Sequence, residues 1–519
     1  MKKIITTVAL LSFVFFAFGQ KMQTSSGAYV KQSPGAYITI DGDLSNAGNF
    51  EVESTSVGTG SLIITGTAAN TGTFTFQRYM SEGVWHYIAE PVNDTRTFNT
   101  ASFLGLTGGI NNDQLYRWDE VLNSGGYTGW WIDILNGTEY SSGTFQTAQG
   151  YSISYTGTGN QTIDFSGVPQ TGDQSISVTN TSGSTGRGSN LIGNPFTSTI
   201  AANRPAQTTD NFIDKNNGTS SIFASGHVAI YLWDEQTSYN GTRNDYKTIN
   251  NSSGATFIEP GQAFMIVAGS NTTAYFHEAI QKHASGTSFY KSGGDDISRF
   301  EILVSNPEDE INTSILCFIP GMTNGLDESY DARKLSGNPN LALYTRLVED
   351  DGEDYAIQSL PPIVDGVSVK LGLRAEVTGT YVFEPSLIEN ITENIPINLE
   401  DKVTGIITDL RKDPAYSFDV FETGIDNERF VLHFKDAVGI EENTATAANY
   451  FYVANNVLYF VDEIEGASTI NLYNLLGQKV LAQQITDNAG SISLNLPTGY
   501  YIVNLTTDGF SVNGKVFLK

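Results

Sequence analysis

Four short sequence blocks occur twice in the same order within residues 77–291, and this duplication limits the folds that the chain can adopt. The two copies of the blocks lie 104, 115, 113 and 111 residues apart, so the copies differ only by loop insertions. The paired blocks are residues 85–91 and 189–195, 115–120 and 230–235, 149–153 and 262–266, and 162–165 and 273–276. Each copy alternates short apolar strands with polar turns. We therefore predict two copies of one β unit, over about residues 77–180 and 181–291.

Composition favours β structure along the whole chain. Of the 519 residues, 52 are glycine and only 16% are charged, and no extended stretch has an apolar 3.6-residue repeat. Segments of β-branched and aromatic residues separated by turn residues favour strands over helices. We predict an all-β, multi-domain string of β-sandwich or jelly-roll-like units. A short β-solenoid at the start and an immunoglobulin-like sandwich at the C-terminus complete this expected architecture.

The net charge argues against one class of partner. Acidic residues outnumber basic residues 56 to 28, which gives a formal charge of −28. A protein that follows the phosphate backbone of a nucleic acid needs the opposite balance, so we expect no nucleic-acid partner. The acidity suits a solvated surface, and it could also attract divalent cations.

Residues 1–19 have the pattern of a signal peptide. Two lysines precede an apolar stretch at 4–18, and Ala17 and Gly19 supply the small residues expected before cleavage at Gln20. No later stretch reaches the roughly 18 consecutive apolar residues of a membrane helix. We therefore expect Sec export to the periplasm and no membrane span.

The first segment after the signal peptide, residues 20–76, contains a shorter repeat. Asn46 and Phe50 recur as Asn70 and Phe74, an offset of 24 residues. Successive rungs of a β-solenoid have such a period. Because two copies are fewer than the roughly three that a stack needs, we expect at most a short cap. A pair of hairpins is the alternative.

Residues 292–436 are more acidic and more regularly strand-like, which predicts a β-sandwich or jelly roll. The lone cysteine, Cys317, has apolar neighbours and is expected to be a small buried hydrophobe in a strand. It cannot form an intramolecular disulfide, so the fold must depend on its cores. Residues 437–449 are small, polar and unpatterned, and we interpret them as a flexible linker.

The last seventy residues, 450–519, alternate short apolar strands with turn residues, which predicts a small antiparallel sandwich. Its distinctive residues are 472–474, Leu476, Gly477, Gln478, Leu496, Pro497, Gly499, Tyr501, Val503, Lys515 and Lys519. In this order at the C-terminus they resemble the type A sorting domain of proteins that Bacteroidota export through the type IX secretion system. The upstream β modules resemble, more loosely, those common in such proteins.

The resemblance implies a cellular destination and two partners. It implies delivery to the cell surface or the medium, with the type IX secretion machinery as one partner. A sortase-like peptidase, the second implied partner, would remove the sorting domain near residues 437–449 after export. The resemblance brings no assigned activity for the rest of the chain.

No stretch has the spacing of a known catalytic motif. Residues 277–281 begin like the zinc-binding HExxH motif, but Gln281 replaces the second histidine, and no G-x-S-x-G sequence occurs. The carboxylates of residues 349–354 could bind calcium, although a turn between strands explains them more simply. We assign no catalytic residue and no cofactor, and leave calcium as an open alternative.

Two adjacent tryptophans, Trp130 and Trp131, are the candidates for ligand contact. Neighbouring residues of a strand point to opposite faces, so one indole could stack on a sugar ring. Trp118 and Trp233 occupy equivalent positions in the two copies and are expected in the core.

Together these features predict an exported, modular β protein with an adhesion, extracellular-matrix or structural role, more consistent with a non-enzyme. The alternative is a carbohydrate-binding protein or a polysaccharide-degrading enzyme that uses loops of the duplicated region. Paired catalytic carboxylates cannot be chosen from sequence, because their separation in space defines them.

Overall fold

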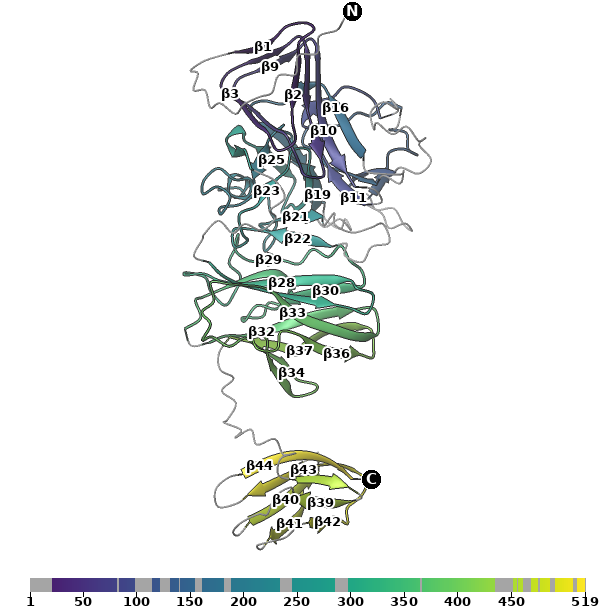
Figure 1. The fold of residues 1–519 in the computed structure, drawn as a ribbon, viewed down its shortest axis with the longest axis vertical. Coiled ribbons are helices and arrows are strands. Elements are labelled where there is room, and N and C mark those ends of the chain that lie inside the picture. Colours follow the sequence, from purple (N-terminus) through teal and green to yellow (C-terminus); the bar gives the residue numbers. More distant parts are fainter. Residues whose placement is uncertain are drawn as a thin grey trace, which may run out of the picture. The chain divides into compact units, whose positions relative to one another are not determined.

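The structure is a computed structural model of the chain. It describes residues 21–518 apart from 82–83, 99–113, 122–130, 140, 155–160, 182–187, 234–244, 285–296, 365, 435–450, 455, 461–467, 475–476, 486–490 and 507–510. The predicted signal peptide and the linker at 437–449 therefore lie outside the described residues. The chain forms two compact units, Met1–Lys435 and Asp436–Lys519. Both units are built of strands, as the all-β prediction requires (Figure 1).

The first unit begins with a short β-solenoid. Its strands pair in parallel along two sheets of three rungs and one of two rungs. The three parallel stacks are β1 (Met22–Thr24), β4 (Leu44–Asn46) and β9 (Ala68–Asn70); β2 (Tyr29–Gln32), β5 (Asn49–Val52) and β10 (Thr73–Met80); and β3 (Tyr37–Ile40) and β8 (Ser61–Ile64). Hairpins would pair antiparallel, so the parallel register rules out that alternative for these strands.

The 24-residue repeat corresponds to stacked side chains in the solenoid. Asn46 pairs with Asn70, and its Nδ2 donates to the Asn70 Oδ1 at 2.8 Å. Phe50 pairs with Phe74, and their buried rings stack with centroids 5.1 Å apart. The sequence predicted two copies, whereas the structure has a third rung, β1 and β2. That rung carries Thr24 where its neighbours carry asparagine, so the sequence pattern does not include it.

The duplicated region consists of two units with the same strand connectivity. Repeat 1 contains β10, β11 (Trp85–Ile88), β12 (Val92–Asn93), β13 (Gln114–Trp118), β14 (Trp131–Asp133), β15 (Tyr151–Ser154), β16 (Gln161–Ser166) and β17 (Val168–Pro169). Repeat 2 contains β18 (Gln174–Val178), β19 (Ser189–Gly193), β20 (Thr199–Ala201), β21 (Ile230–Trp233), β22 (Tyr246–Ile249), β24 (Ala263–Val267), β25 (Thr272–Phe276) and β26 (Gln281–Lys282). It adds α1 (Phe212–Asn216) and β23 (Phe257–Ile258).

Equivalent strands pair with equivalent partners in the two repeats. The sheet β11-β15-β13-β14 corresponds to β19-β24-β21-β22. The antiparallel pair β10–β16 corresponds to β18–β25, and β12–β17 corresponds to β20–β26. The four repeated blocks supply four of these equivalent strand pairs: β11/β19, β13/β21, β15/β24 and β16/β25.

Two boundaries expected from sequence fall differently in the structure. The boundary between residues 76 and 77 lies inside β10, which is both the last solenoid rung and the first strand of repeat 1. A single hydrophobic core, from Ile40 to Phe165, joins these two parts. The boundary at 180/181 lies after β18, which already pairs within repeat 2. Strand pairing extends across the first boundary, and the second separates β18 from the repeat with which it pairs.

An 11-stranded sheet follows the repeats. Its strands are β27 (Ser298–Ser305), β28 (Ile311–Phe318), β29 (Ala332–Arg333), β30 (Leu341–Thr345), β31 (Tyr355–Leu360), β32 (Ser368–Ala375), β33 (Gly379–Glu389), β34 (Asn398–Asp401), β35 (Ile406–Asp409), β36 (Tyr416–Val420) and β37 (Gly424–His433). Inward residues of nearly all these strands share one core, so the sheet curls over itself. At the closure Phe418 packs on Phe430 with ring centroids 4.6 Å apart, and the Tyr416 hydroxyl donates to Asp401 at 2.8 Å. Cys317 is fully buried in β28, as predicted.

The second unit is a small sandwich of two antiparallel sheets around its own core. One sheet contains β38 (Phe451–Ala454), β39 (Val457–Phe460) and β42 (Ser491–Ser493), and the other contains β41 (Lys479–Ile485), β40 (Ser468–Asn474), β43 (Gly499–Thr506) and β44 (Ser511–Leu518). This is the architecture that the alternating strands of residues 450–519 predicted. Among the described residues, no helix has the length and apolarity needed to span a membrane.

Candidate functional site

The two repeats meet along a seam with approximate twofold symmetry. The Ala89 N–H donates to the Gly261 carbonyl at 3.0 Å, and the Gly193 N–H donates to the Ala148 carbonyl at 2.9 Å. The donors are equivalent in the two repeats, at an offset of 104, and so are the acceptors, at an offset of 113. Each repeat therefore presents the same surface to the other, as in a symmetric dimer. We call this contact the repeat seam.

Small residues allow the close approach at the repeat seam. Gly193 faces Ala89, its own repeat equivalent, and a Cβ on the glycine would lie 2.3 Å from the Ala89 Cβ. Gly150 faces Ala263 in the same way, and its Cβ would lie 2.9 Å from that of Ala263. A side chain larger than one methyl group per pair would push the two backbones apart.

Each repeat carries an aromatic pair across the last two strands of its four-stranded sheet, β13–β14 and β21–β22. Trp118 is opposite Trp131 with ring centroids 5.1 Å apart, and Trp233 is opposite Tyr246 at 5.3 Å. Both pairs are edge-on, and Tyr87 packs against members of both, 5.7 Å from Trp131 and 5.5 Å from Trp233. Cross-strand aromatic pairs of this kind stabilise a sheet.

This geometry places the candidate sugar-contact residues. The Trp131 ring packs against Trp118 and Tyr87 and is only partly exposed. Trp130 lies outside the described residues. Trp118 and Trp233 are also half-buried at the edge of the cluster rather than deep in a core, because the cluster lies between the repeats and the sheet of residues 298–433.

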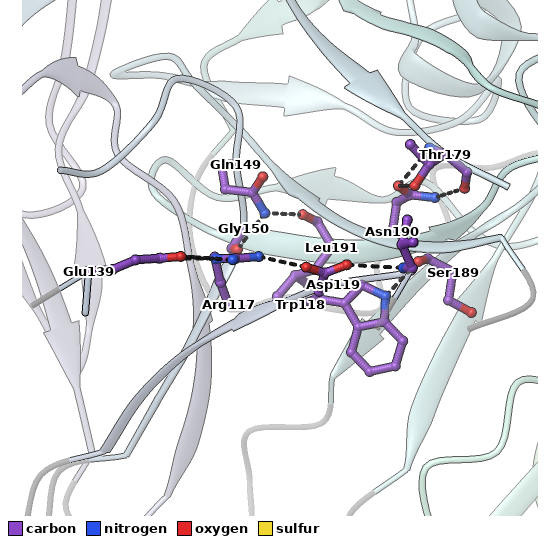
Figure 2. A network of polar contacts seen from close by, with 11 residues as sticks. Arg117, Trp118, Asp119, Glu139, Gln149, Gly150, Thr179, Ser189, Asn190 and Leu191 are labelled. Carbon is purple, nitrogen blue, oxygen red and sulfur yellow. Dashed lines mark hydrogen bonds and ion pairs between the residues drawn. The ribbon is translucent and has the colours of Figure 1, made fainter. Parts of the chain in front are cut away.

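Polar contacts close the repeat seam beside the aromatic cluster (Figure 2). The Trp118 Nε1 donates to the Ser189 carbonyl at 2.5 Å, and the Gln149 Nε2 donates to the Leu191 carbonyl at 3.1 Å. The Arg117 guanidinium binds Glu139 with contacts of 2.7–3.0 Å and reaches Asp119 at 3.2 Å. The one cation of this network, Arg117, and both carboxylates, Asp119 and Glu139, are thus engaged in structural contacts.

Buried carboxyl groups show how the repeats differ. Glu90 is almost fully buried, and this burial raises its pKa to about 8, although its Oε2 accepts a hydrogen bond from the Asp94 N–H at 3.3 Å. Its equivalent in repeat 2 is Asn194, whose Nδ2 donates to the carbonyls of Ser198, Ile258 and Glu259. The same position therefore holds a protonated carboxyl in one repeat and an amide in the other.

A cavity of about 210 Å³ lies between repeat 2 and the outer face of the 11-stranded sheet. Its wall includes β22 of repeat 2 and strands β27, β28 and β31 of the sheet. The lining mixes apolar side chains with Asp245, Lys247, Glu301, Asn312 and Lys334. Burial raises the pKa of Glu301, although the Ser386 hydroxyl donates to it at 2.7 Å.

The carboxylate run at 349–354 lies in the turn between β30 and β31, as the simpler interpretation predicted. Two arginines contact it: Arg346 approaches Asp354 at 3.1 Å, and Arg333 lies 3.6 Å from Asp351. Within the part of the chain that the structure describes, no group of three or more His, Cys, Asp or Glu side chains is placed to hold a metal ion.

The residues of the HExxH-like stretch have other roles. Glu278–Ile280 is a single 3₁₀ turn, and the His277 Nδ1 faces Asp173 at 3.0 Å. His283 lies against the solenoid, where its two ring nitrogens contact the hydroxyls of Thr39 and Ser61, each at 2.8 Å. These histidines join parts of the fold.

The sorting-domain residues form turns of the second unit. Gly477 has a φ of +75° in the turn between β40 and β41, and the Gln478 N–H donates to the Asn474 side chain at 3.0 Å. The Tyr501 hydroxyl donates to the Pro497 carbonyl at 2.8 Å, which fixes the turn leading into β43. The remaining residues of this set are placed as follows: Leu496 packs on the core of the unit, Gly499 begins β43, Lys515 lies over the exposed Tyr500 ring, and Leu476 and Lys519 are outside the described residues.

Three findings relate the chain to known proteins. A family model described as a domain of unknown function (DUF8693) matches residues 3–434, and the model of the secretion system C-terminal sorting domain matches residues 447–519. The chain is also similar to the minor fimbrium subunit Mfa5 of Porphyromonas gingivalis, with 24% identity over 470 residues. That similarity covers 83% of this chain but 34% of the relative, so the chain spans about a third of the relative's length. The sorting domain makes the chain a secreted or cell-surface protein of the Bacteroidota type, handled by the type IX secretion machinery.

Proposed function

Because the chain belongs to the family of this domain of unknown function (DUF8693) and ends in a sorting domain, we propose that it is a non-enzymatic, adhesion-type subunit of a cell-surface structure. The observation that carries the proposal is the similarity to a minor fimbrium subunit along most of the chain. The first unit would be the functional part, and the second unit the means of delivery.

The internal contacts of the first unit support a role in which the protein is a rigid structural element. The solenoid is joined to repeat 2 by the Leu62 N–H, which donates to the Thr197 carbonyl at 2.8 Å, and by the Thr197 hydroxyl, which donates back to Leu62 at 2.8 Å. Repeat 2 is joined to the 11-stranded sheet by a buried turn, in which the Ser252 and Ser359 hydroxyls lie 2.6 Å apart. Buried, hydrogen-bonded junctions resist relative motion better than exposed linkers do.

Adhesion can be tested on whole cells. A strain without this chain should attach less well to host cells, to matrix proteins or to partner bacteria than its complemented parent. Surface abundance of the chain must be measured in parallel, so that lost attachment is separated from lost delivery. Normal attachment of the deletion strain to all these surfaces would contradict the proposed function.

Delivery is a separate part of the proposal. We propose that residues 1–19 direct Sec export and that a sortase-like peptidase cuts near residues 437–449. Deleting residues 450–519 should leave the protein in the periplasm, which immunoblots of cell fractions would detect. Replacing only Val480, an exposed residue of the second unit, with threonine is a matched control that should preserve delivery.

Carbohydrate binding is the second candidate, suggested by the partly exposed Trp131. If its indole binds sugar, the secreted protein should give saturable signals on a glycan array, and Trp131→Ala should remove them. Because this change also breaks the aromatic pair with Trp118, Trp233→Ala serves as the control that breaks the equivalent pair of repeat 2. Equal loss in both variants would point to unfolding of the seam and not to sugar contact.

A further inference from the structure

Three buried polar side chains meet at the junction between repeat 2 and the 11-stranded sheet. Lys334 follows β29, Asn312 lies in β28, and Asp245 directly precedes β22 of repeat 2. The Lys334 Nζ lies 2.9 Å from the Asn312 Oδ1 and 2.9 Å from the Asp245 Oδ2. The Asn312 Nδ2 donates to the same Asp245 oxygen. Only 5% of the Lys334 side chain and 10% of the Asp245 side chain are exposed.

The network fixes the orientation of the Asn312 amide. Its Oδ1 faces two donors, the Lys334 ammonium and the Leu343 N–H, which lies at 2.9 Å. Its Nδ2 faces two acceptors, Asp245 and the Leu341 carbonyl at 3.4 Å. The Gly337 N–H holds the other Asp245 oxygen at 2.6 Å. The junction therefore holds an amine and an amide carbonyl that a backbone N–H polarises. It also holds a carboxylate that contacts both the amine and the amide nitrogen.

We propose that Lys334 and Asn312 join in an intramolecular isopeptide bond, with Asp245 as the proton carrier. Asp245 accepts one proton from the Lys334 ammonium, and the neutral Nζ attacks the Asn312 Cγ to form the new C–N bond. The Leu343 N–H stabilises the negative charge on Oδ1 in the tetrahedral intermediate, as an oxyanion-hole donor does. Asp245 then gives its proton to Nδ2, the Cγ–Nδ2 bond breaks, and ammonia leaves. The second Nζ proton passes through Asp245 to the ammonia, so the products are one amide and one ammonium ion.

The position of the three residues adds a condition to this reaction. The amine and the amide belong to the 11-stranded sheet, whereas the carboxylate belongs to repeat 2. The bond can therefore form only after these two parts have docked, and it then closes the loop of residues 312–334 permanently. The cavity beside the junction is lined by all three residues, which gives the released ammonia a space to enter. Proximity of this kind removes most of the entropic cost of bringing two groups together.

Mass spectrometry of the mature protein, purified from culture, tests the proposal without any variant. We expect an intact mass lower than that of the mature sequence by one ammonia. We also expect a tryptic peptide in which the segments containing Asn312 and Lys334 are joined. The joined peptide distinguishes the bond from cyclised Asn312, which loses the same ammonia within one peptide. Two separate peptides at full mass would overturn the proposal and leave a buried ion pair only.

Single-residue variants test the roles of Lys334 and Asp245 in forming the bond. Lys334→Arg keeps the positive charge and Asp245→Asn keeps the shape, and both should give the full mass and no joined peptide. Lys247→Arg alters another lysine of the same cavity and should keep the joined peptide. Thermal melting of each variant shows that it is folded, and a folded Asp245→Asn protein that still forms the bond would contradict the role of Asp245. The test does not depend on the adhesion proposal, since it is read from mass alone.

Discussion

Repeat 1 and repeat 2 have equivalent strands, the same strand pairing and an aromatic pair at the same place, yet they are stabilised by different surroundings. Repeat 1 shares its core with the solenoid: its strand β10 ends the parallel stack, and β16 adds an antiparallel strand to the same sheet. Repeat 2 has a core of its own and lies against the 11-stranded sheet through an apolar cluster that includes Tyr231 and Ile357. The duplicated β unit thus keeps its topology, while its outer surfaces differ according to the part of the fold that each copy contacts.

Residues that differ between equivalent positions mark this adaptation. Where repeat 1 has Ala89 at the repeat seam, repeat 2 has Gly193, because only one methyl group fits between them. Where repeat 1 has Glu90, repeat 2 has Asn194. Trp118 and Trp233 are identical in type, but within the described part of the chain the Trp118 indole N–H bonds across the seam and the Trp233 indole N–H does not. Each difference can be exchanged or removed, which gives three tests of the comparison.

At a fixed pH, the largest effect is expected at the close contact of the repeat seam. Gly193→Ala places a methyl group 2.3 Å from the Ala89 Cβ, and we expect it to lower the unfolding free energy of the first unit by about 3 kcal/mol, as strong overpacking does. Adding Ala89→Gly moves the methyl group to the other repeat. The double variant should recover most but not all of this loss, because residues in contact are energetically coupled while the contact of the new methyl group with the Ala263 Cβ at 3.0 Å remains.

Denaturant unfolding of the four proteins in this cycle measures the coupling. Gly218→Ala is the control, since a Cβ there meets nothing within 4 Å. If the double variant is as unstable as Gly193→Ala, the methyl group cannot be exchanged between positions 89 and 193, which would contradict the equivalence of the two positions at this seam.

The second test concerns pH. The folded pKa of Glu90, about 8, lies above its ordinary value of 4.5, so the folded state holds a proton that the unfolded state releases between these values. Stability from this group is therefore present below pH 4.5 and is lost as pH rises through 8. We expect a decline of about 4 kcal/mol across this window in the wild type and a flatter profile in Glu90→Gln.

Unfolding free energies at pH 5 and pH 8.5 provide the measurement. Asn194→Gln alters the equivalent amide of repeat 2 without a titrating group, and its pH profile should parallel that of the wild type. A Glu90→Gln profile as steep as the wild-type profile would assign the pH dependence to other groups.

The smallest effect is expected at the two tryptophans. Trp118→Phe removes a hydrogen bond to the Ser189 carbonyl, whereas Trp233→Phe removes a buried indole N–H that has no hydrogen-bond partner among the described residues. Both changes remove a similar ring area, so the difference between the unfolding free energies of the two variants isolates the contribution of the hydrogen bond. We expect Trp118→Phe to be the more destabilising by about 1 kcal/mol. Equal melting temperatures for the two variants would show that the indole bond across the seam adds nothing.

Local patterns allowed much of the fold to be predicted. The duplication and the 24-residue stack of Asn46 on Asn70 and Phe50 on Phe74 appear as repeats in the sequence, and the burial of Cys317 follows from its apolar neighbours in a strand. The third solenoid rung was missed, because Thr24 and Val30 replace the asparagine and phenylalanine of the other rungs. Likewise Trp118 and Trp233 were expected in a core, but each lies half-buried at a junction that only the docking of separate parts creates.

The cluster of Lys334, Asn312 and Asp245 gave no signal in the sequence. The three residues come from separate elements, and none belongs to a motif with a fixed spacing. Their hydrogen bonds exist because repeat 2 docks on the outer face of β28, which brings a carboxylate to an amine and an amide of the sheet. A long-range contact of this kind depends on how two folded parts fit.

The sequence predicts the secreted destination of this protein, its β class and its duplicated unit. Each of these depends on short patterns of apolar and turn residues that local strands and turns require. The tertiary structure alone decided that the repeats face each other about an approximate twofold axis and that the solenoid and repeat 1 share a core. It also decided that Asp245 meets Lys334. Those features depend on surfaces far apart in the chain, and only packing brings such surfaces together.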